Sequence, residues 1–251
     1  MARLSVSAKP SLLRFARETS ALVLAGLACW AVVGWLAAGM GSMPGTMGLG
    51  LAAFVGVWTL MMVAMMLPSV APVATLYARS FTAGRGVRVF AFAAGYLVVW
   101  VAVGLPAYGV AWAIDQLVTS SGVATRAVVG GMFLAVAAYQ LTPLKRICLA
   151  HCRSPMSQLL HYASFDGRFR DFRIGAHHAA FCLGCCWALM LLLVGLGTMN
   201  LLVMVGLAAV VLLEKYTPHG LVISRLAAAA AAAIAIATVA SPQLMLGAPA
   251  G

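Results

Sequence analysis

Charged residues are scarce in this chain. Asp, Glu, Lys and Arg together make up 8% of the 251 residues, whereas 64% are hydrophobic and the mean hydropathy is +1.03. A soluble domain carries about 25% charged residues, so the composition excludes an ordinary water-soluble fold. Several apolar runs approach the roughly 20 residues that a helix needs to cross a bilayer. We therefore expect an all-α fold, built as a polytopic bundle of transmembrane helices.

Acidic residues are the scarcest charged type, with five Asp and Glu against 16 Lys and Arg, and the formal net charge is +11. In a soluble protein this excess would suggest nucleic-acid binding, but no RNA- or DNA-binding motif accompanies it. The sequence also lacks an ATP-binding Gly-rich loop. We therefore expect the basic residues to meet lipid rather than nucleic acid, and any transport to be passive or gradient-driven.

The apolar runs predict about seven transmembrane helices, with six as the alternative. The fifth and sixth runs are nearly fused at residues 197–200, and a re-entrant turn there would lower the count. The predicted helices are 21–38, 48–67, 89–113, 123–141, 179–196, 199–213 and 226–240.

Basic residues alternate between loops, as the positive-inside rule requires. With seven helices, all of them except Arg126 fall on the side of the N-terminus. This predicts a multi-pass protein of the bacterial inner (plasma) membrane with a cytoplasmic N-terminus. We expect residues 1–20 to be a basic cytoplasmic segment before a retained first helix, and 242–251 to be a short tail. Residues 21–241 then form one transmembrane domain, with a Cys/His-rich cytoplasmic loop at 142–178.

Cysteines are few, but five of the six lie between Cys148 and Cys186. Thr142 and Pro143 suit the N-cap and first position of a short helix. Because residues four apart share a helix face, Cys148 and Cys152 would point the same way on that helix. In a second segment, one face gathers His178, Cys182, Cys185 and Cys186.

These residue types indicate a site for a soft metal. Thiolates select Cu(I), Zn(II) or iron–sulfur clusters, and imidazole suits the first two. We expect Cu(I), with Zn(II) as the alternative. Lys145, Arg146 and Arg153 are expected to lower the pKa of the neighbouring thiols and to favour the metal-binding thiolate. Packing or loop roles rather than metal binding are expected for Cys29, His161 and His219.

Three other interpretations of the cysteines stay open. They could be small buried residues in helix contacts. Cys182, Cys185 and Cys186 could instead cycle between dithiol and disulfide, which would make the protein a membrane thiol-disulfide oxidoreductase. A structural zinc site could also hold the loop to the helices. We favour a metal-binding protein that is not an enzyme.

Four methionines fall within six positions of the second apolar run, at Met61, Met62, Met65 and Met66. The first and third share one helix face, and the second and fourth share another. Thioethers are soft ligands that favour Cu(I), so this Met ladder indicates a copper path. The alternative is that methionine serves as a flexible core filler.

Five sequence blocks follow one another between Trp58 and Lys215: WTLMMVAMMLPSVAP, YQLTPLKRICLAHCRSP, GAHHAAFCLGCCWALM, GTMNL and LLEK. In this order they resemble a bacterial family of predicted metal-binding integral membrane proteins, a domain of unknown function. The resemblance implies a multi-helix membrane fold and metal binding, and it supplies no agreed reaction. The residues that it implies for the metal are Met61, Met62, Met65, Met66, Cys148, His151, Cys152, His178, Cys182, Cys185, Cys186 and Glu214.

Glu214 is also a candidate on its own chemistry, because an acid at the membrane edge is commonly functional. The structural alternative is that it pairs with the adjacent Lys215. Together these features predict an integral membrane protein that handles, transports or delivers copper or zinc. Its expected partners are the lipid bilayer, the metal ion, and a metallochaperone or membrane metalloenzyme.

Overall fold

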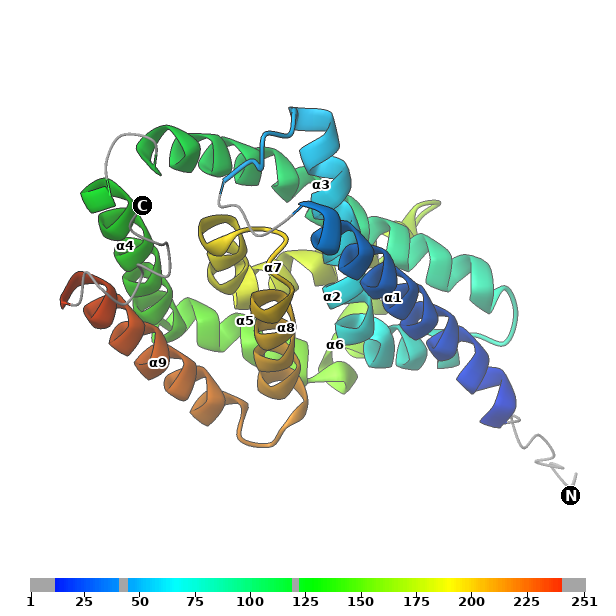
Figure 1. Cartoon of the computed structure of the whole chain (residues 1–251). Coiled ribbons are helices and arrows are strands. Elements are labelled where there is room, and N and C mark those ends of the chain that lie inside the picture. Colours follow the sequence, from blue (N-terminus) through cyan, green and yellow to red (C-terminus); the bar gives the residue numbers. More distant parts are fainter. Residues whose placement is uncertain (1–11, 41–44, 119–121, 241–251) are drawn as a thin grey trace, which may run out of the picture.

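The computed structural model describes residues 12–40, 45–118 and 122–240, and within these ranges every regular element is an α-helix (Figure 1). The predicted all-α fold is therefore confirmed. The helices are α1 Leu12–Met40, α2 Leu51–Arg79, α3 Arg85–Val118, α4 Gly122–Gln140, α5 Pro143–Arg153, α6 Pro155–Tyr162, α7 Arg170–Leu196, α8 Leu201–Tyr216 and α9 Gly220–Ala240.

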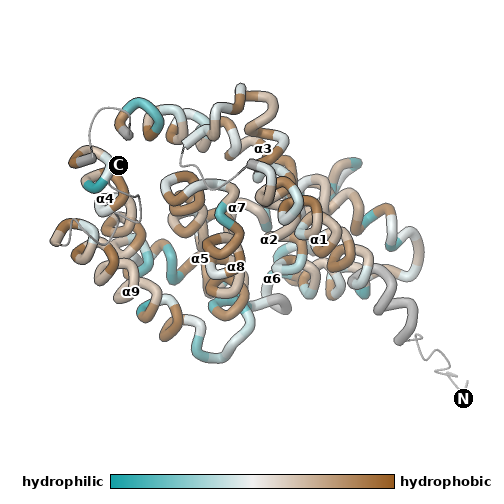
Figure 2. The backbone as a smooth tube through the Cα atoms, viewed as in Figure 1, coloured by the Kyte–Doolittle hydropathy of each residue, from teal (hydrophilic) through white to brown (hydrophobic). Residues whose placement is uncertain are grey.

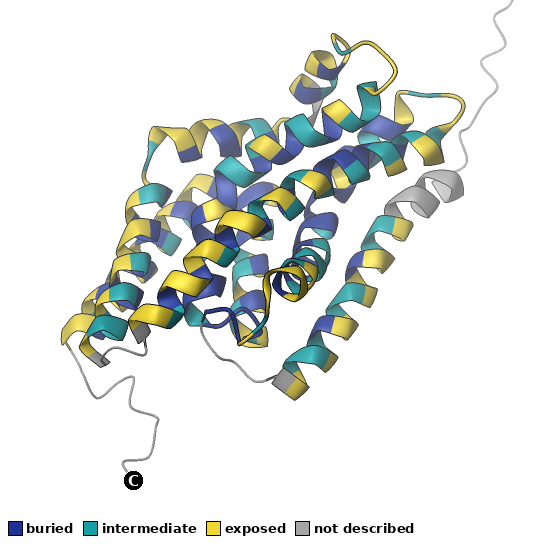
Figure 3. Ribbon diagram, turned by 90° about the horizontal axis from the view of Figure 1, so that it is seen from above, coloured by how far each residue is buried: buried dark blue, intermediate teal, exposed yellow. Residues whose placement is uncertain are grey.

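Six of these helices are long and apolar enough to cross a membrane: α1, α2, α3, α4, α7 and α9. Hydrophobic residues run along their length (Figure 2). Large apolar side chains also point outward, such as Trp35, Val87 and Leu202, which are 75%, 76% and 85% exposed. Exposed and buried residues alternate around the helices (Figure 3), an arrangement typical of helices whose outer faces meet lipid. The predicted sixth span corresponds to α8, which has only 16 residues.

Helix α7 lies at the centre of the bundle. It packs against α3, α4, α5 and α8, and in Figure 1 it lies with α5 and α8 between the α1–α2 pair and the α4–α9 pair. Its contact with α3 depends on two glycines, one on each helix, and each lies against the backbone of the other helix. A Cβ atom on Gly175 would collide with the Phe92 carbonyl group, and one on Gly95 would collide with the Phe172 carbonyl. Small residues allow such close approach between membrane helices.

Helix α7 begins at Arg170, nine residues before the predicted start at 179. Its first turns carry polar residues that an apolar window does not detect. Asp171 favours the positive N-terminal end of the helix dipole, accepts a hydrogen bond from the Tyr77 hydroxyl and lies 3.3 Å from the Arg88 guanidinium. The longer helix places His177 on the same helix as the cysteines of the second segment.

The segment predicted as a loop at 142–178 holds α5, α6 and the start of α7. The predicted start of α5 is confirmed, because the Thr142 side chain caps the helix by accepting a hydrogen bond from the Lys145 backbone N–H, and Pro143 occupies the first turn. Helix α5 packs against α7.

Candidate metal centre

Three buried thiols gather on one face of α7. Cys182, Cys185 and Cys186 stand three and four positions apart, which is the spacing of neighbours on a helix surface. Their Sγ atoms all lie within 4.8 Å of one another, and each residue is at most 1% exposed. A metal about 2.3 Å from each sulfur holds the sulfurs of a three-coordinate site about 4 Å apart. Small side-chain rotations would therefore fit this group to one ion.

Helix α5 brings two more thiols to this group. Cys152 is buried on α5 and interacts electrostatically with Cys185. Cys148 packs against the α7 backbone, where a Cβ atom on Gly184 would lie 2.6 Å from its Sγ atom. The glycine in the Cys-Leu-Gly-Cys-Cys segment therefore makes room for the sulfur of α5. We call these five residues the thiol cluster: Cys148, Cys152, Cys182, Cys185 and Cys186.

The prediction that nearby basic residues lower the thiol pKa values on α5 is confirmed only for the effect of Lys145 on Cys148, and burial outweighs that effect. Burial raises the pKa of Cys148 above its ordinary value, Cys185 raises it further, and the opposing charge of Lys145 does not reverse the shift. The interaction with Cys185 and burial together raise the pKa of Cys152 well above its ordinary value. Arg153 instead donates to the Thr217 and Pro218 carbonyl groups. Both thiols are therefore protonated at neutral pH, and metal binding must displace their protons.

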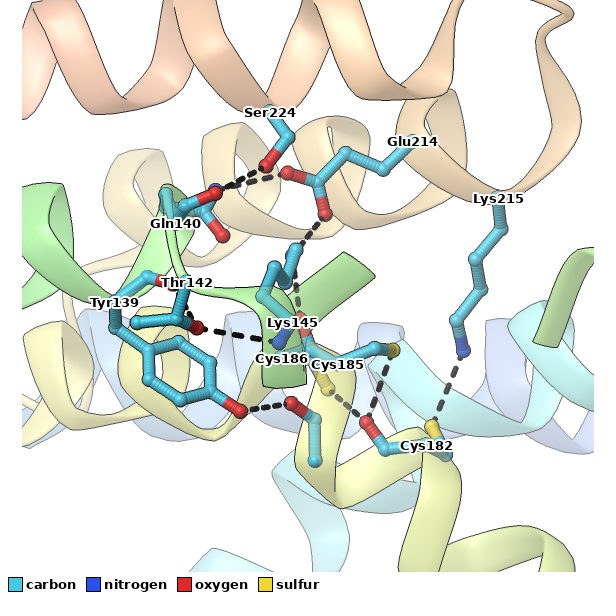
Figure 4. Close-up of polar contacts among 11 residues, drawn as sticks. Tyr139, Gln140, Thr142, Lys145, Cys182, Cys185, Cys186, Glu214, Lys215 and Ser224 are labelled. Atoms are coloured by element: carbon cyan, nitrogen blue, oxygen red, sulfur yellow. Dashed lines mark hydrogen bonds and ion pairs between the residues drawn. The ribbon is translucent and has the colours of Figure 1, made fainter. Parts of the chain in front are cut away.

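A lysine that sequence reasoning did not assign to the site reaches into the thiol cluster from α8. The Nζ atom of Lys215 lies 3.1 Å from the Cys182 Sγ atom (Figure 4). It also lies 3.1 Å from the Ser69 Oγ atom. The Tyr96 hydroxyl lies 3.0 Å from the same sulfur. Consecutive helical residues do not face each other, so Glu214 and Lys215 could have been expected to point to different partners.

Glu214 pairs with a lysine on α5. Its Oε2 atom lies 2.6 Å from the Lys145 Nζ atom, with both side chains at most 1% exposed, and its Oε1 atom accepts from the Gln140 amide at 2.8 Å (Figure 4). Lys145 also donates to the Cys185 carbonyl group. This buried network ties α4, α5 and α8 to the segment of α7 that carries the thiols.

The two histidines predicted as ligands lie in different environments. His178 is 2% exposed, and its Nδ1 atom lies 2.9 Å from the Tyr162 hydroxyl, which leaves Nε2 as the nitrogen it could offer to a metal. The His151 ring stacks on Phe181 at a centroid distance of 3.8 Å. Burial, aided by His177 and His161, lowers the pKa of His151, so its imidazole is neutral at pH 7, as a metal ligand must be.

The Met ladder of α2 lies in the same core. Its four residues are at most 2% exposed. The Met66 Sδ atom lies 4.0 Å from the Ser69 Oγ atom, which accepts a hydrogen bond from Lys215 at 3.1 Å. Ser69 and Lys215 therefore connect the end of the Met ladder to the Cys182 sulfur.

Comparison with known protein families finds a match over most of the chain. Residues 55–238 match the PpoB2 family, which is described as a copper chaperone. No curated protein and no solved structure matches the chain significantly. The matched range contains the Met ladder, the thiol cluster and both buried lysines, and it covers well over half of the chain. The protein therefore belongs to the PpoB2 copper chaperone family.

Proposed function

We propose that this protein is an integral membrane copper chaperone that binds Cu(I) on the thiol cluster. The observation that carries the proposal is the burial of three α7 thiols within 4.8 Å of one another, with two further buried thiols on α5. Sulfur ligands favour Cu(I), and the same core holds thioethers, which favour Cu(I) over Zn(II). Membership of a copper chaperone family supports the same metal.

Lys215 supplies charge compensation in this proposal. Cu(I) bound by three thiolates carries a net negative charge, and burial of such a complex costs free energy unless a cation lies nearby. The Lys215 ammonium group, 3.1 Å from the Cys182 sulfur, is that cation. Burial of the thiolate complex therefore costs less free energy with Lys215 beside it than it would without the lysine.

The Met ladder serves as the path by which copper leaves or reaches the thiol cluster. Its end at Met66 connects to the cluster through Ser69 and Lys215. Thioethers bind Cu(I) less tightly than thiolates do, so they suit passage rather than storage. The recipient in this account is a membrane metalloenzyme or a metallochaperone.

The membrane orientation is part of the proposal. We place the N-terminus, α5 and α6 in or against the cytoplasm, because nearly all basic residues fall on that side when α8 counts as a seventh, short span. An alkaline phosphatase reporter, which is active only outside the cytoplasm, tests this point. A fusion within 197–200 should be active and one at 217–219 inactive; the opposite pattern would rule out the orientation.

Metal analysis of the purified protein tests the copper site. The wild type is incubated with Cu(I) without oxygen in detergent, beside Cys182→Ser, Cys185→Ser and the matched control Cys29→Ser, whose cysteine lies alone on α1. We expect the wild type and Cys29→Ser to retain at least one more equivalent of copper than the two α7 variants. Copper retention that is equal in all four proteins would contradict the proposal.

The same variants distinguish the thiol-disulfide alternative. The closeness of the three α7 sulfurs also suits disulfide exchange, which needs no bound metal. A folded wild type that binds no Cu(I), but whose thiols exchange with a disulfide reagent, would favour the oxidoreductase instead. Zn(II) binding in place of Cu(I) would favour the structural zinc site.

A further inference from the structure

Three histidines form a second group next to the thiol cluster, and each comes from a different helix. His161 lies at the end of α6, His177 on the first part of α7 and His151 on α5. The ring centroids of His161 and His177 are 4.9 Å apart, and those of His177 and His151 are 5.9 Å apart. We call these three residues the imidazole ladder.

The imidazole ladder runs from the surface towards the buried cysteines. His161 is exposed, His177 and His151 are half-buried, and Cys152, the residue after His151, is buried. Phe165 and Phe181 line the ladder, with ring centroids 5.5 Å and 5.1 Å from that of His177. The aromatic rings hold the imidazoles in place while their nitrogen atoms stay available.

Two nitrogen atoms of the ladder are buried without a hydrogen-bond partner. They are the Nε2 atom of His151 and the Nδ1 atom of His177. Buried polar atoms nearly always have a partner, and an exception calls for an explanation such as an ion. A metal ion bound about 2 Å from each ring nitrogen would supply that partner at the observed ring separations.

We propose that the imidazole ladder is a second copper site, which accepts Cu(I) at the protein surface and passes it to the thiol cluster. This inference rests on the proposed function. Two neighbouring imidazoles suffice for Cu(I), which readily adopts two-coordinate geometry, and His161 with His177 form the outer pair. His177 with His151 form the inner pair, beside Cys152.

Transfer along the ladder is ligand exchange. Copper remains Cu(I) throughout, each step breaks one copper–nitrogen bond, and the next nitrogen or sulfur forms the new bond. At the last step a thiol gives up its proton to water as the copper–sulfur bond forms. Because thiolate is the softer ligand and binds Cu(I) more tightly than imidazole does, the transfer runs towards the cluster.

The test compares His161→Phe and His177→Phe with the matched control His219→Phe. Phenylalanine retains an aromatic ring and removes the nitrogen atoms, and His219 is an exposed loop histidine outside the ladder. Each protein in detergent is titrated with Cu(I) without oxygen against a coloured Cu(I) chelator. X-ray absorption then counts imidazole nitrogens around the bound copper. His161 is exposed, so His161→Phe remains informative if His177→Phe fails to fold.

We expect the wild type and His219→Phe to bind one more equivalent of Cu(I), with imidazole ligands, than His177→Phe, which breaks both pairs. His161→Phe keeps the inner pair and should lose imidazole ligands and loading rate rather than the whole equivalent. Copper bound to sulfur should be unchanged in amount but slower to load in the ladder variants. Equal stoichiometry and equal loading rates in all four proteins would overturn the inference. Failure of the proposed function would be recognised separately, as sulfur-bound copper that is absent from the wild type or unchanged in amount in Cys182→Ser and Cys185→Ser.

Discussion

The buried ion pair between Lys145 and Glu214 gives the sharpest prediction of stability. Lys145→Met removes the cation and leaves the Glu214 carboxylate buried, at most 1% exposed, with only the Gln140 amide as a partner. Breaking a buried pair from one side costs about 3–5 kcal/mol, because it leaves an uncompensated charge. The Cys185 carbonyl group also loses its donor, which costs roughly 1–3 kcal/mol.

The double variant separates charge from packing. Lys145→Met combined with Glu214→Gln leaves no buried charge, and the new amide oxygen still accepts from Gln140. Replacing both members of a buried pair with neutral groups is often close to neutral. We therefore expect the double variant to recover most of the stability that either single variant loses.

The assay is unfolding of the purified protein in mixed micelles with rising SDS, followed by tryptophan fluorescence. We expect Lys145→Met alone and Glu214→Gln alone to unfold at clearly lower SDS, and the double variant to unfold near the wild type. A Lys145→Met protein within about 1 kcal/mol of the wild type would refute the reasoning, since that is the range of exposed pairs. A double variant whose loss equals the sum of the single losses would also refute it.

Three further predictions concern copper affinity. In Gly184→Ala the new methyl group would lie 2.6 Å from the Cys148 sulfur, so this variant should displace the sulfur and weaken Cu(I) binding in chelator competition. The control Gly206→Ala places its methyl group in open space and should bind Cu(I) as the wild type does. Lys215→Met should weaken Cu(I) binding about 10–100-fold while copper remains bound to sulfur in X-ray absorption spectra. Cu(I) affinity should rise with pH from 6 to 8. The pKa values of Cys148 and Cys152 are raised, so their protons must leave before the metal binds. A pH-independent affinity would show that these thiols do not take part.

Local signals in the sequence predicted several elements well. The helical class followed from long apolar runs, and the start of α5 followed from the cap at Thr142 and Pro143, because caps depend on neighbours in the chain. The start of α7 was missed by nine residues. Arg170 and Asp171 are polar, and their partners lie on other helices, which no local window contains: Asp171 contacts α2 and α3, and Arg170 donates to the Tyr162 carbonyl of α6.

The partners of the two lysines could not be predicted from spacing alone. Lys145 was expected to act on the thiols of its own helix, but its Nζ atom pairs with Glu214, 69 positions away. Lys215 was considered only as a partner for its neighbour, although the helical rotation between them directs it to Cys182. His161 was set aside as an isolated loop residue, and it lies beside His177 only because α6 folds back onto α7.

X-ray absorption at the copper edge tests the central claim most directly, on the purified wild-type protein loaded with one equivalent of Cu(I) without oxygen. The account predicts a first coordination shell of three or four sulfur atoms, because the thiol cluster binds the first ion more tightly than the imidazole ladder does. A shell of nitrogen or oxygen atoms without sulfur would contradict the assignment of the thiol cluster as the copper site.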